Sequence, residues 1–505
     1  MNERGHLLGF DVGSSSIKAS LVDIESGAII ASASSPDTEM EIIAERPGWA
    51  EQHPQMWWEH MCNAVAMIRA QGNATDAVRA IGISYQMHGL VMVDRDGSVI
   101  RPSIIWCDSR AVEIGERAMK ELGEEVCLSR LLNSPGNFTA SKLAWVKENE
   151  PSLYSRIWKM MLPGDYLAFR ITGEAITTES GLSEAILWDS QAEGPASFVV
   201  DHFGFDPEII PDAKPSFAVH GHVRPAAANA LGVPVDIPVS YRAGDQPNNA
   251  LSLNVLQPGE LAATAGTSGV VYGVADRPVY DPASRVNTFV HVNHTREQSR
   301  YGVLLCLNGT GICNRWFKQE TVDGPGGAVA YDAINELAAR APVGSNGVVV
   351  LPFGNGAERT LENRDIGASV HGLNFNVHDR SHLLRAVQEG IVFGLADGFE
   401  IMKAMGMNVR TVKAGDTNMF QSELFRSAFA TTTGTVVELY DTDGSVGAAR
   451  GAGIGAGIYG DSAEAFGQLK PTHTIEPEPS LMNPYRDAFE AWRSTLNTVL
   501  SGYQG

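Results

Sequence analysis

The chain has 505 residues, a formal net charge of −21, and ordinary hydrophobic (44%) and charged (19%) fractions. Its length exceeds what one hydrophobic core supports, so we expect at least two domains. The strong negative charge argues against nucleic acid and anionic membrane as partners, and five scattered cysteines without a CxxC pair indicate reduced thiols in the cytoplasm. The sequence has neither a signal-peptide core nor an apolar run approaching the roughly 20 residues of a membrane span.

The first predicted element is a β-hairpin. Residues 7–12 and 17–23 have the composition of strands, and the small residues 13–16 form the turn between them. Glycine lets a backbone approach a ligand closely, and successive N–H groups in such a turn form a concavity that binds anions. Asp11 enters this turn, where its carboxylate could orient a magnesium ion, directly or through water. The alternative is an Asx-turn residue that only shapes the loop.

A helix is predicted after Pro54, because apolar residues recur there at three- and four-residue spacing. It is followed by a strand over residues 80–84, which leads into Gln86, Met87, His88 and Gly89. Gln and His side chains offer donors and acceptors suited to sugar hydroxyls. A lone His at a strand end is more often structural, so this motif is a weak signal by itself.

A second polar motif follows the next apolar run and comprises Trp106, Cys107, Asp108, Ser109 and Arg110. An Asp and an Arg that flank a turn usually form an internal ion pair or hydrogen bonds. They could instead bracket a polyol, and the sequence leaves both interpretations open.

The strand over residues 237–241 precedes Gly244, Asp245 and Gln246, after which a helix is predicted. A carboxylate at the carboxyl end of a strand, just before a helix, lies where open α/β sheets bind ligands. Asp245 could equally be the N-cap of the helix. Local sequence does not decide between the two.

A second hairpin over residues 261–271 repeats the first, with the turn 266–268 aligned 253 positions after the turn at Gly13. Two such turns that face each other could hold a polyphosphate from both sides. The repeat therefore predicts a two-lobed, nucleotide-dependent enzyme with a cleft between the lobes. We expect residues 1–249 to form the first lobe and residues 250–505 the second, and alternating strand and helix patterns predict the α/β class.

The rest of the second half is mainly helical in pattern. A stripe of apolar residues runs from Leu384 to Met402 and predicts a long core helix. The segment 455–460 fits GxGxxG, but it ends a Gly/Ala-rich helical stretch, so close helix packing explains it better than a nucleotide loop. An amphipathic helix is predicted near the C-terminus, on either lobe.

These segments resemble the FGGY family of carbohydrate kinases, and within it most closely the xylulokinases. The resemblance covers nearly the whole length and is carried by both hairpins and by ordered motifs between and after them. Those motifs are residues 47–52 with Trp57 and Trp58, 86–90, 106–110, 138–145, 162–166, 244–245, 358–360 and 385–390.

The resemblance implies two actin-like, ribonuclease H-type lobes with a cleft, the first holding a sugar and the second holding ATP. It implies that Asp245 is the catalytic base and that Asp11 acts at the magnesium–phosphate centre, with Asp245 as a second candidate magnesium ligand. The implied sugar-binding residues are Gln86, Met87, His88, Gly89, Trp106, Asp108 and Asp245. The implied nucleotide-binding residues are Gly13, Ser14, Ser15, Ser16, Lys18, Gly266, Thr267, Ser268, Gly309, Gly415, Asp416 and Asn418.

The expected reaction is transfer of the γ-phosphoryl group of MgATP to a ketopentose hydroxyl, with D-xylulose preferred. Aspartate at an ordinary pKa of roughly 4 suffices as the base, because the alcohol loses its proton late in such a transfer. The alternatives are a family member acting on ribulose, gluconate or a deoxysugar, and a non-catalytic ATP-binding sugar sensor. Among oligomeric assemblies, a homodimer is the possible state for this chain.

The sequence departs from the family pattern at three places. The segment 414–418 reads Ala-Gly-Asp-Thr-Asn where a glycine run followed by Ala-Lys-Ser is usual, and Asp416 adds a negative charge near the nucleotide. Tyr85 and Cys107 replace the usual Gly and Asn beside the sugar motifs.

Overall fold

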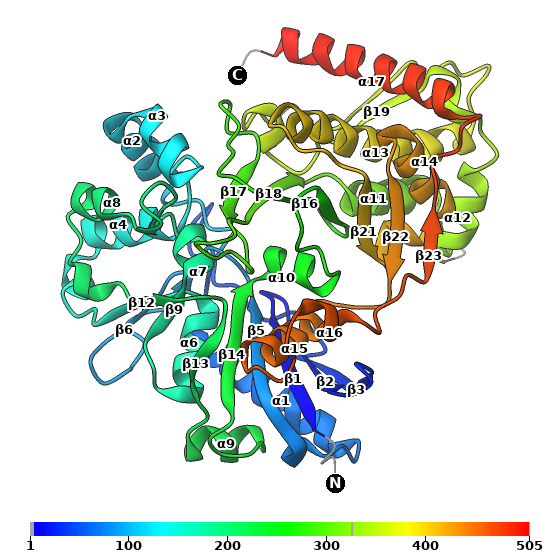
Figure 1. Cartoon of the computed structure of the whole chain (residues 1–505). Coiled ribbons are helices and arrows are strands. Elements are labelled where there is room, and N and C mark those ends of the chain that lie inside the picture. Colours follow the sequence, from blue (N-terminus) through cyan, green and yellow to red (C-terminus); the bar gives the residue numbers. More distant parts are fainter. Residues whose placement is uncertain (1–4, 325–326, 504–505) are drawn as a thin grey trace.

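A computed structural model describes residues 5–324 and 327–503. Two β-sheets organise it, one in each lobe (Figure 1). The first sheet has the strand order β13 (Phe217–His222), β14 (Pro238–Gly244), β5 (Val78–Tyr85), β1 (His6–Val12), β2 (Ile17–Asp23) and β3 (Ile29–Ser35). The second has the order β17 (Asn287–Val290), β18 (Tyr301–Leu307), β16 (Gly269–Ala275), β15 (Glu260–Ala265), β21 (Thr411–Gly415), β22 (Val436–Tyr440) and β23 (His473–Ile475).

The two sheets share one topology. In the first, β1, β2 and β3 form an antiparallel meander, and β5 and β14 extend it parallel to β1. In the second, β15, β16 and β18 form the meander, and β21 and β22 extend it parallel to β15. The hairpins β1–β2 and β15–β16 therefore occupy equivalent places. This confirms the predicted pair of homologous α/β lobes with ribonuclease H-type sheets.

Helix α15 (Gly444–Gly455) returns from the second half of the chain and covers one face of the first sheet (Figure 1). The contact is close because glycines line both surfaces. A Cβ at Gly9 of β1 would overlap the carbonyl oxygen of Ser445, and a Cβ at Gly82 of β5 would overlap that of Ala448. Within the predicted GxGxxG segment, close packing accounts for Gly455, where a Cβ would overlap the Ser240 carbonyl oxygen, whereas Gly457 has a φ of +69° beyond the helix and faces open space.

The other predicted helices are present. Helix α1 (Pro54–Ala70) buries Trp58, Met61, Val65 and Ile68, and α13 (Arg380–Ala404) buries the whole predicted stripe. The C-terminal helix α17 (Met482–Gly502) packs on α13, on α14 (Glu423–Thr433) and on β19 (Val349–Leu351), and so belongs to the second lobe. Within the residues that the structure describes, no helix is both long enough and apolar enough to cross a membrane.

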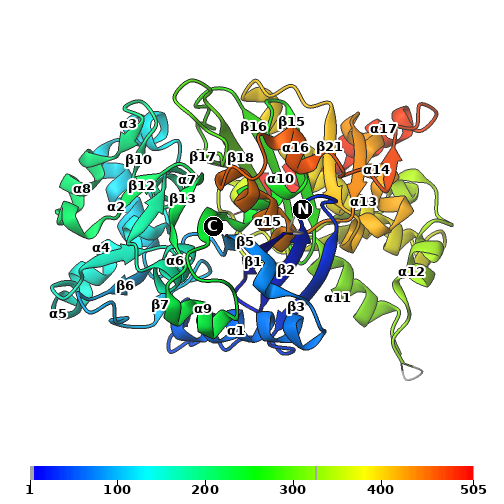
Figure 2. The same cartoon turned by 60° about the horizontal axis from the view of Figure 1, so that its bottom comes forward.

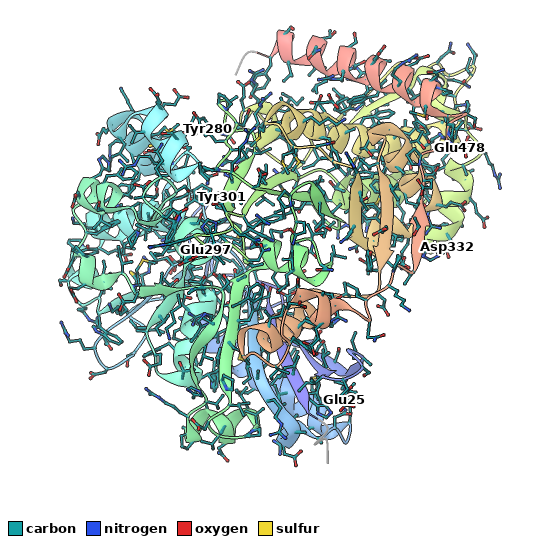
Figure 3. The ribbon with its side chains drawn as sticks, viewed as in Figure 1. Glu25, Tyr280, Glu297, Tyr301, Asp332 and Glu478 are labelled. Carbon is teal, nitrogen blue, oxygen red and sulfur yellow. The ribbon has the colours of Figure 1, made fainter. Side chains whose placement is uncertain are left out.

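The edge strand β17 of the second sheet is bound into the first lobe (Figure 2). Its Val290 N–H donates to Ser183 Oγ at 2.9 Å, and its Thr288 N–H donates to Asn133 Oδ1 at 3.0 Å. Phe289 of β17 and Tyr301 of β18, the latter labelled near the centre of Figure 3, belong to the hydrophobic core of the first lobe. The two lobes are therefore joined along one side by an edge strand as well as by the chain crossings.

Candidate active site

Asp245 lies at the carboxyl end of the parallel strands of the first sheet. It is the first residue of α10 (Asp245–Ser252) and directly follows β14. The N-cap of α10 is Gly244, and no side chain caps the helix, so the N-cap alternative for Asp245 is not supported. Burial, and then the charge of Asp11, raise the pKa of Asp245 from 3.8 to about 7. This differs from the ordinary carboxylate expected from the sequence.

Asp11 is the penultimate residue of strand β1 and pairs with Ser84 of β5, whose hydroxyl donates to Asp11 Oδ1 at 2.7 Å. Burial raises the pKa of Asp11, and the negative charge of Asp443 acts in the same direction. Asp443 is the N-cap of α15 and accepts the N–H groups of Ser445 and Val446. Lys18 pairs with Asp443 at 2.6 Å, so its ammonium lies between the first hairpin and α15.

The first turn lies beside an exposed tryptophan. Gly13 N–H donates to Ser16 O at 3.0 Å, which closes the turn, and Ser15 at its tip is exposed. Gln52 Nε2 donates to Ser14 O at 2.7 Å, and Trp106 Nε1 lies 3.3 Å from Ser14 Oγ. The Trp106 side chain is 53% exposed, which leaves its ring free to cover a ligand.

The second turn forms one wall of a pocket of about 360 Å³. The N–H groups of Gly311 and Ile312, at the start of α11 (Gly311–Thr321), donate to Gly266 O and Thr267 O at 2.8 and 3.1 Å. Ser268 contacts the Cys306 thiol. The remaining walls come from α11, α12 (Tyr331–Ala338) and residues 418–422: Asn314, Arg315, Tyr331, Asp332, Asn335, Asn418, Met419, Gln421 and Ser422.

The predicted nucleotide residues after position 300 take different positions. Asn418 lines the pocket, and its Nδ2 would lie 3.6 Å from a Cβ at Gly266. Gly309 lies against Pro352, where a Cβ would overlap the Pro352 carbonyl. Asp416, which follows Gly415 at the end of β21, accepts a hydrogen bond from Thr472 Oγ at 2.9 Å and lies 3.2 Å from His473 Nδ1. These partners fix the Asp416 carboxylate beside β23.

The Gln-Met-His-Gly motif follows β5, and three of its four residues contact other parts of the first lobe. Gln86 is buried and donates to Gln52 Oε1 at 3.2 Å, so it supports Gln52 and the first turn behind the cleft surface. Met87 packs against Gly244, where a Cβ would lie 2.5 Å from Met87 Cγ. Gly89 lies against Pro163, with 2.6 Å between that proline and a Cβ at Gly89.

His88 is the residue of this motif that is not fully buried. Its Nδ1 lies 3.0 Å from the carbonyl oxygen of Glu184, and because a carbonyl only accepts, Nδ1 carries the proton and Nε2 is left as an acceptor. Burial, followed by the charges of Lys142 and Arg359, lowers the pKa of His88 to about 3, so the ring is neutral. The φ angle of +62° places a non-glycine residue in the left-handed region, a strain of roughly 1–3 kcal/mol.

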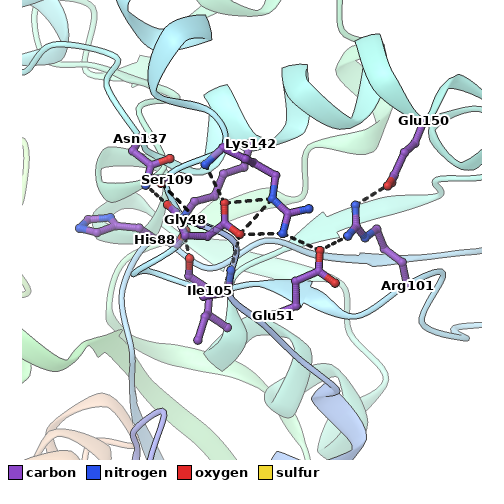
Figure 4. Close-up of polar contacts among 12 residues, drawn as sticks. Gly48, Glu51, His88, Arg101, Ile105, Ser109, Asn137, Lys142 and Glu150 are labelled. Carbon is purple, nitrogen blue, oxygen red and sulfur yellow. Dashed lines mark hydrogen bonds and ion pairs between the residues drawn. The ribbon is translucent and has the colours of Figure 1, made fainter. Parts of the chain in front are cut away.

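Asp108 is fully buried, and it belongs to the network of polar contacts drawn around Glu51 and Arg101 in Figure 4. Its carboxylate accepts the Ala50 N–H at 2.6 Å and pairs with Arg110 Nη2 at 2.6 Å. Arg110 also pairs with Glu51, which pairs in turn with Arg101. The structure favours the internal ion pair over direct contact between Asp108 and a sugar.

Carboxylate oxygens are the ligands that Mg²⁺ prefers, and the ion usually takes only one or two of them, with water and phosphate completing its shell. Asp11 and Asp245 fit that donor set, because they lie at the carboxyl ends of β1 and β14, which flank β5, and the charge of Asp11 raises the pKa of Asp245. Within residues 5–324 and 327–503, no three His, Cys, Asp or Glu side chains form a metal cluster. A magnesium ion here would depend on the nucleotide for part of its coordination.

Several residues of the cleft escaped the sequence prediction. Asn314 and Arg315 follow Gly311 in the first turn of α11, and the order strand, glycine turn, helix is a usable signal for them. Asp443 carries the local signal of an N-cap but no sign that it lies near Asp11. Glu184 has no sequence signal, because it reaches His88 only through the tertiary fold.

Family models and known proteins match this chain along nearly its whole length. Residues 6–252 match the N-terminal domain of the FGGY family of carbohydrate kinases, and residues 261–458 match its C-terminal domain. Xylulose kinase of Bacillus subtilis is 27% identical, with 99% of each chain covered. A crystal structure named as a xyloylose kinase of Brucella ovis has a TM-score of 0.88 at 26% identity, covering 99% of this chain and 100% of that one. A gluconate kinase of Lactobacillus acidophilus also reaches 0.88, at 22% identity and 99% coverage of both chains, and supports the fold alone.

Proposed function

The chain belongs to the FGGY family of carbohydrate kinases, and from that premise we propose that it transfers the γ-phosphoryl group of MgATP to a terminal hydroxyl of a ketopentose, D-xylulose. The single observation that carries the proposal is Asp245, a carboxylate that directly follows Gly244, against which Met87 packs, and whose pKa is raised to about 7. The xylulose kinases among its relatives support the choice of sugar.

We assign the sugar to residues 1–249 and the nucleotide to residues 250–505. His88 Nε2 accepts a hydrogen bond from one sugar hydroxyl, and Trp106 covers the sugar from the side of the first turn. The nucleotide base and ribose enter the pocket beside Asn418, with Asn314 and Arg315 facing them. The N–H groups of residues 13–16 and 266–268 then hold the phosphates from opposite lobes.

In the transfer, Asp245 accepts the proton of the attacking hydroxyl. A base with a pKa near the working pH combines a large ionised fraction with an adequate driving force for proton transfer. Asp11 and Asp245 would hold magnesium, which when bound neutralises phosphate charge. Phosphoryl transfer depends mainly on alignment of the acceptor oxygen with the phosphate and on charge stabilisation, and the paired turns supply both. The five free thiols are consistent with a cytoplasmic enzyme.

The proposal is tested by replacing Asp245 with Asn and following ADP release with D-xylulose, ribulose, gluconate and a deoxysugar. We expect D-xylulose to give the highest kcat/KM, and the variant to lose about 10²–10⁴ in kcat while MgATP binding survives. The exposed Asp212→Asn serves as the control and should be fully active. A variant as active as the parent would remove Asp245 from its role, and a tenfold preference for another acceptor would replace D-xylulose as the substrate.

A further inference from the structure

We propose that Glu184 and Lys142 are positioning residues of the sugar site, which together hold His88 so that its Nε2 points at an acceptor hydroxyl. The inference rests on the proposed function of the cleft and names two residues that act through His88. Neither was among the residues expected from the sequence to touch substrate.

His88 has a backbone conformation that needs external support. Its φ of +62° is unusual for a residue other than Gly or Asn. Such conformations persist where the surrounding structure over-determines them, and they gather at ligand sites. The His88 ring is held by edge contacts with Phe138, at 4.7 Å between ring centroids, and by Phe289 of β17 at 5.5 Å. Those contacts fix the plane of the ring but not the position of its proton.

Glu184 supplies two acceptors to His88. It is the last residue of α7 (Glu179–Glu184) and is 1% exposed. Its Oε1 accepts the His88 backbone N–H at 3.4 Å, and its carbonyl oxygen accepts the ring Nδ1–H at 3.0 Å. The first bond, the one that a change of the Glu184 side chain removes, supports the left-handed turn. The second is accepted by the backbone carbonyl and fixes the tautomer that leaves Nε2 as an acceptor.

The other carboxyl oxygen of Glu184 reaches toward the catalytic strand end. Oε2 is buried without a hydrogen-bond partner among the described residues, and a Cβ on Gly244 would lie 2.5 Å from it. Glu184 therefore spans the distance between His88 and the residue that precedes Asp245. Burial raises the pKa of Glu184 well above its ordinary value, and the negative charge of Asp245 acts in the same direction.

Lys142 binds the backbone carbonyl of the same residue (Figure 4). It lies in α4 (Thr139–Asn149) and has no exposed surface. Its Nζ donates to His88 O at 2.8 Å and to Ile105 O at 2.9 Å. Because Ile105 immediately precedes Trp106, this one lysine side chain joins the two loops that would contact the sugar. His88 is thus bonded at its N–H, its carbonyl and its ring.

The same helix offers a matched control. Lys147 Nζ also donates to two backbone carbonyls, those of Phe203 and Gly204, the first at 2.7 Å. Those carbonyls belong to the C-terminal end of α8 (Ser197–Phe203) and its cap, not to the sugar loops. Loss of this lysine removes bonds of the same kind without loosening His88.

The test is to measure KM for D-xylulose and for MgATP in Glu184→Ala, Glu184→Gln, Lys142→Met and Lys147→Met. We expect Glu184→Ala and Lys142→Met to raise the sugar KM at least tenfold while the MgATP KM stays within twofold. Glu184→Gln keeps an acceptor oxygen and should bring the sugar KM back to within threefold of the parent. Lys147→Met should lower the thermal midpoint and leave both KM values unchanged.

A sugar KM within twofold of the parent in both Glu184→Ala and Lys142→Met would overturn the inference, as would a parallel rise in both KM values. If Glu184→Ala fails to fold, Glu184→Asp withdraws the carboxyl by one methylene and must still raise the sugar KM. A parent protein that transfers phosphate to none of the sugars would overturn the proposed function and this inference together, whereas an active parent with indifferent variants would overturn only the inference.

Discussion

Replacing Asp245 with Asn should make the folded protein more stable, and the gain should grow as the pH rises. In the folded state, burial and then the charge of Asp11 raise the pKa of Asp245 to about 7, from an ordinary value of 3.8. A carboxyl with a raised folded pKa contributes its full stability below the unfolded pKa, where both states are protonated. That contribution is lost as the pH rises from about 4 to 7, because the unfolded chain ionises first. Asparagine never ionises, so the Asp245→Asn variant does not lose this stability as the pH rises.

The size of the effect follows from the shift. About three pKa units at 1.36 kcal/mol each set a ceiling of about 4 kcal/mol at pH 8. Roughly half of that ceiling, about 2 kcal/mol, falls between pH 5.5 and pH 8. The carboxylate is only partly buried and part of its shift belongs to the pair with Asp11, so we expect a measured gain of about 1–2 kcal/mol over this interval.

The assay is urea unfolding of the parent and Asp245→Asn at pH 5.5 and pH 8.0, with the free energy of unfolding compared between proteins at each pH. Comparison at fixed pH cancels the titration of all other groups. Asp11→Asn alone should also stabilise the fold, and the double variant should gain less than the sum of the two, because either change removes the same repulsion. A variant less stable than the parent, or a gain equal at both pH values, would refute the argument from burial and repulsion.

Three further predictions concern packing and the two ligand sites. Gly9→Ala should lower the free energy of unfolding by about 1–3 kcal/mol in urea titrations, because the added Cβ meets the backbone of α15. The control Gly502→Ala adds a Cβ in open space and should change the free energy of unfolding by less than about 0.5 kcal/mol. Trp106→Ala should raise KM for the sugar about tenfold in steady-state kinetics, the loss of one aromatic contact of about 1.4 kcal/mol, and an unchanged KM would exclude the ring from the site. Asp416→Ala should leave KM for MgATP within about twofold, because its carboxylate is already paired beside β23, and a large improvement would mean that this charge faces the nucleotide.

Much of the fold follows from local sequence. The two hairpins, the strand that ends before Asp245 and the long helix of the second lobe each carry a complete local pattern of strand, small-residue turn or apolar stripe. Such patterns are reliable because backbone geometry and side-chain periodicity act within a few residues. The equivalence of the two lobes follows from the repeat of the hairpin pattern in the second half of the chain.

Other features depend on contacts between distant segments. The packing of α15 on β1 joins residues more than 400 positions apart, and the binding of β17 to Asn133 joins residues of different lobes. The burial of Asp108 and the raised pKa of Asp245 depend on the same assembly. A sequence motif identifies the type of side chain at a site, but whether that side chain faces the cleft or an internal partner depends on what the rest of the chain packs against it.

The position of α15 has a consequence for folding during synthesis on the ribosome. All six strands of the first sheet have been synthesised by residue 244, but the helix that covers one of its faces is complete only at residue 455. At a synthesis rate of about 5–20 residues per second, that apolar face stays uncovered for roughly 10–40 s before α15 is complete. The nascent first half is therefore a natural client for a chaperone, and a gene fragment that stops near residue 250 would yield an aggregating sheet instead of a separate domain.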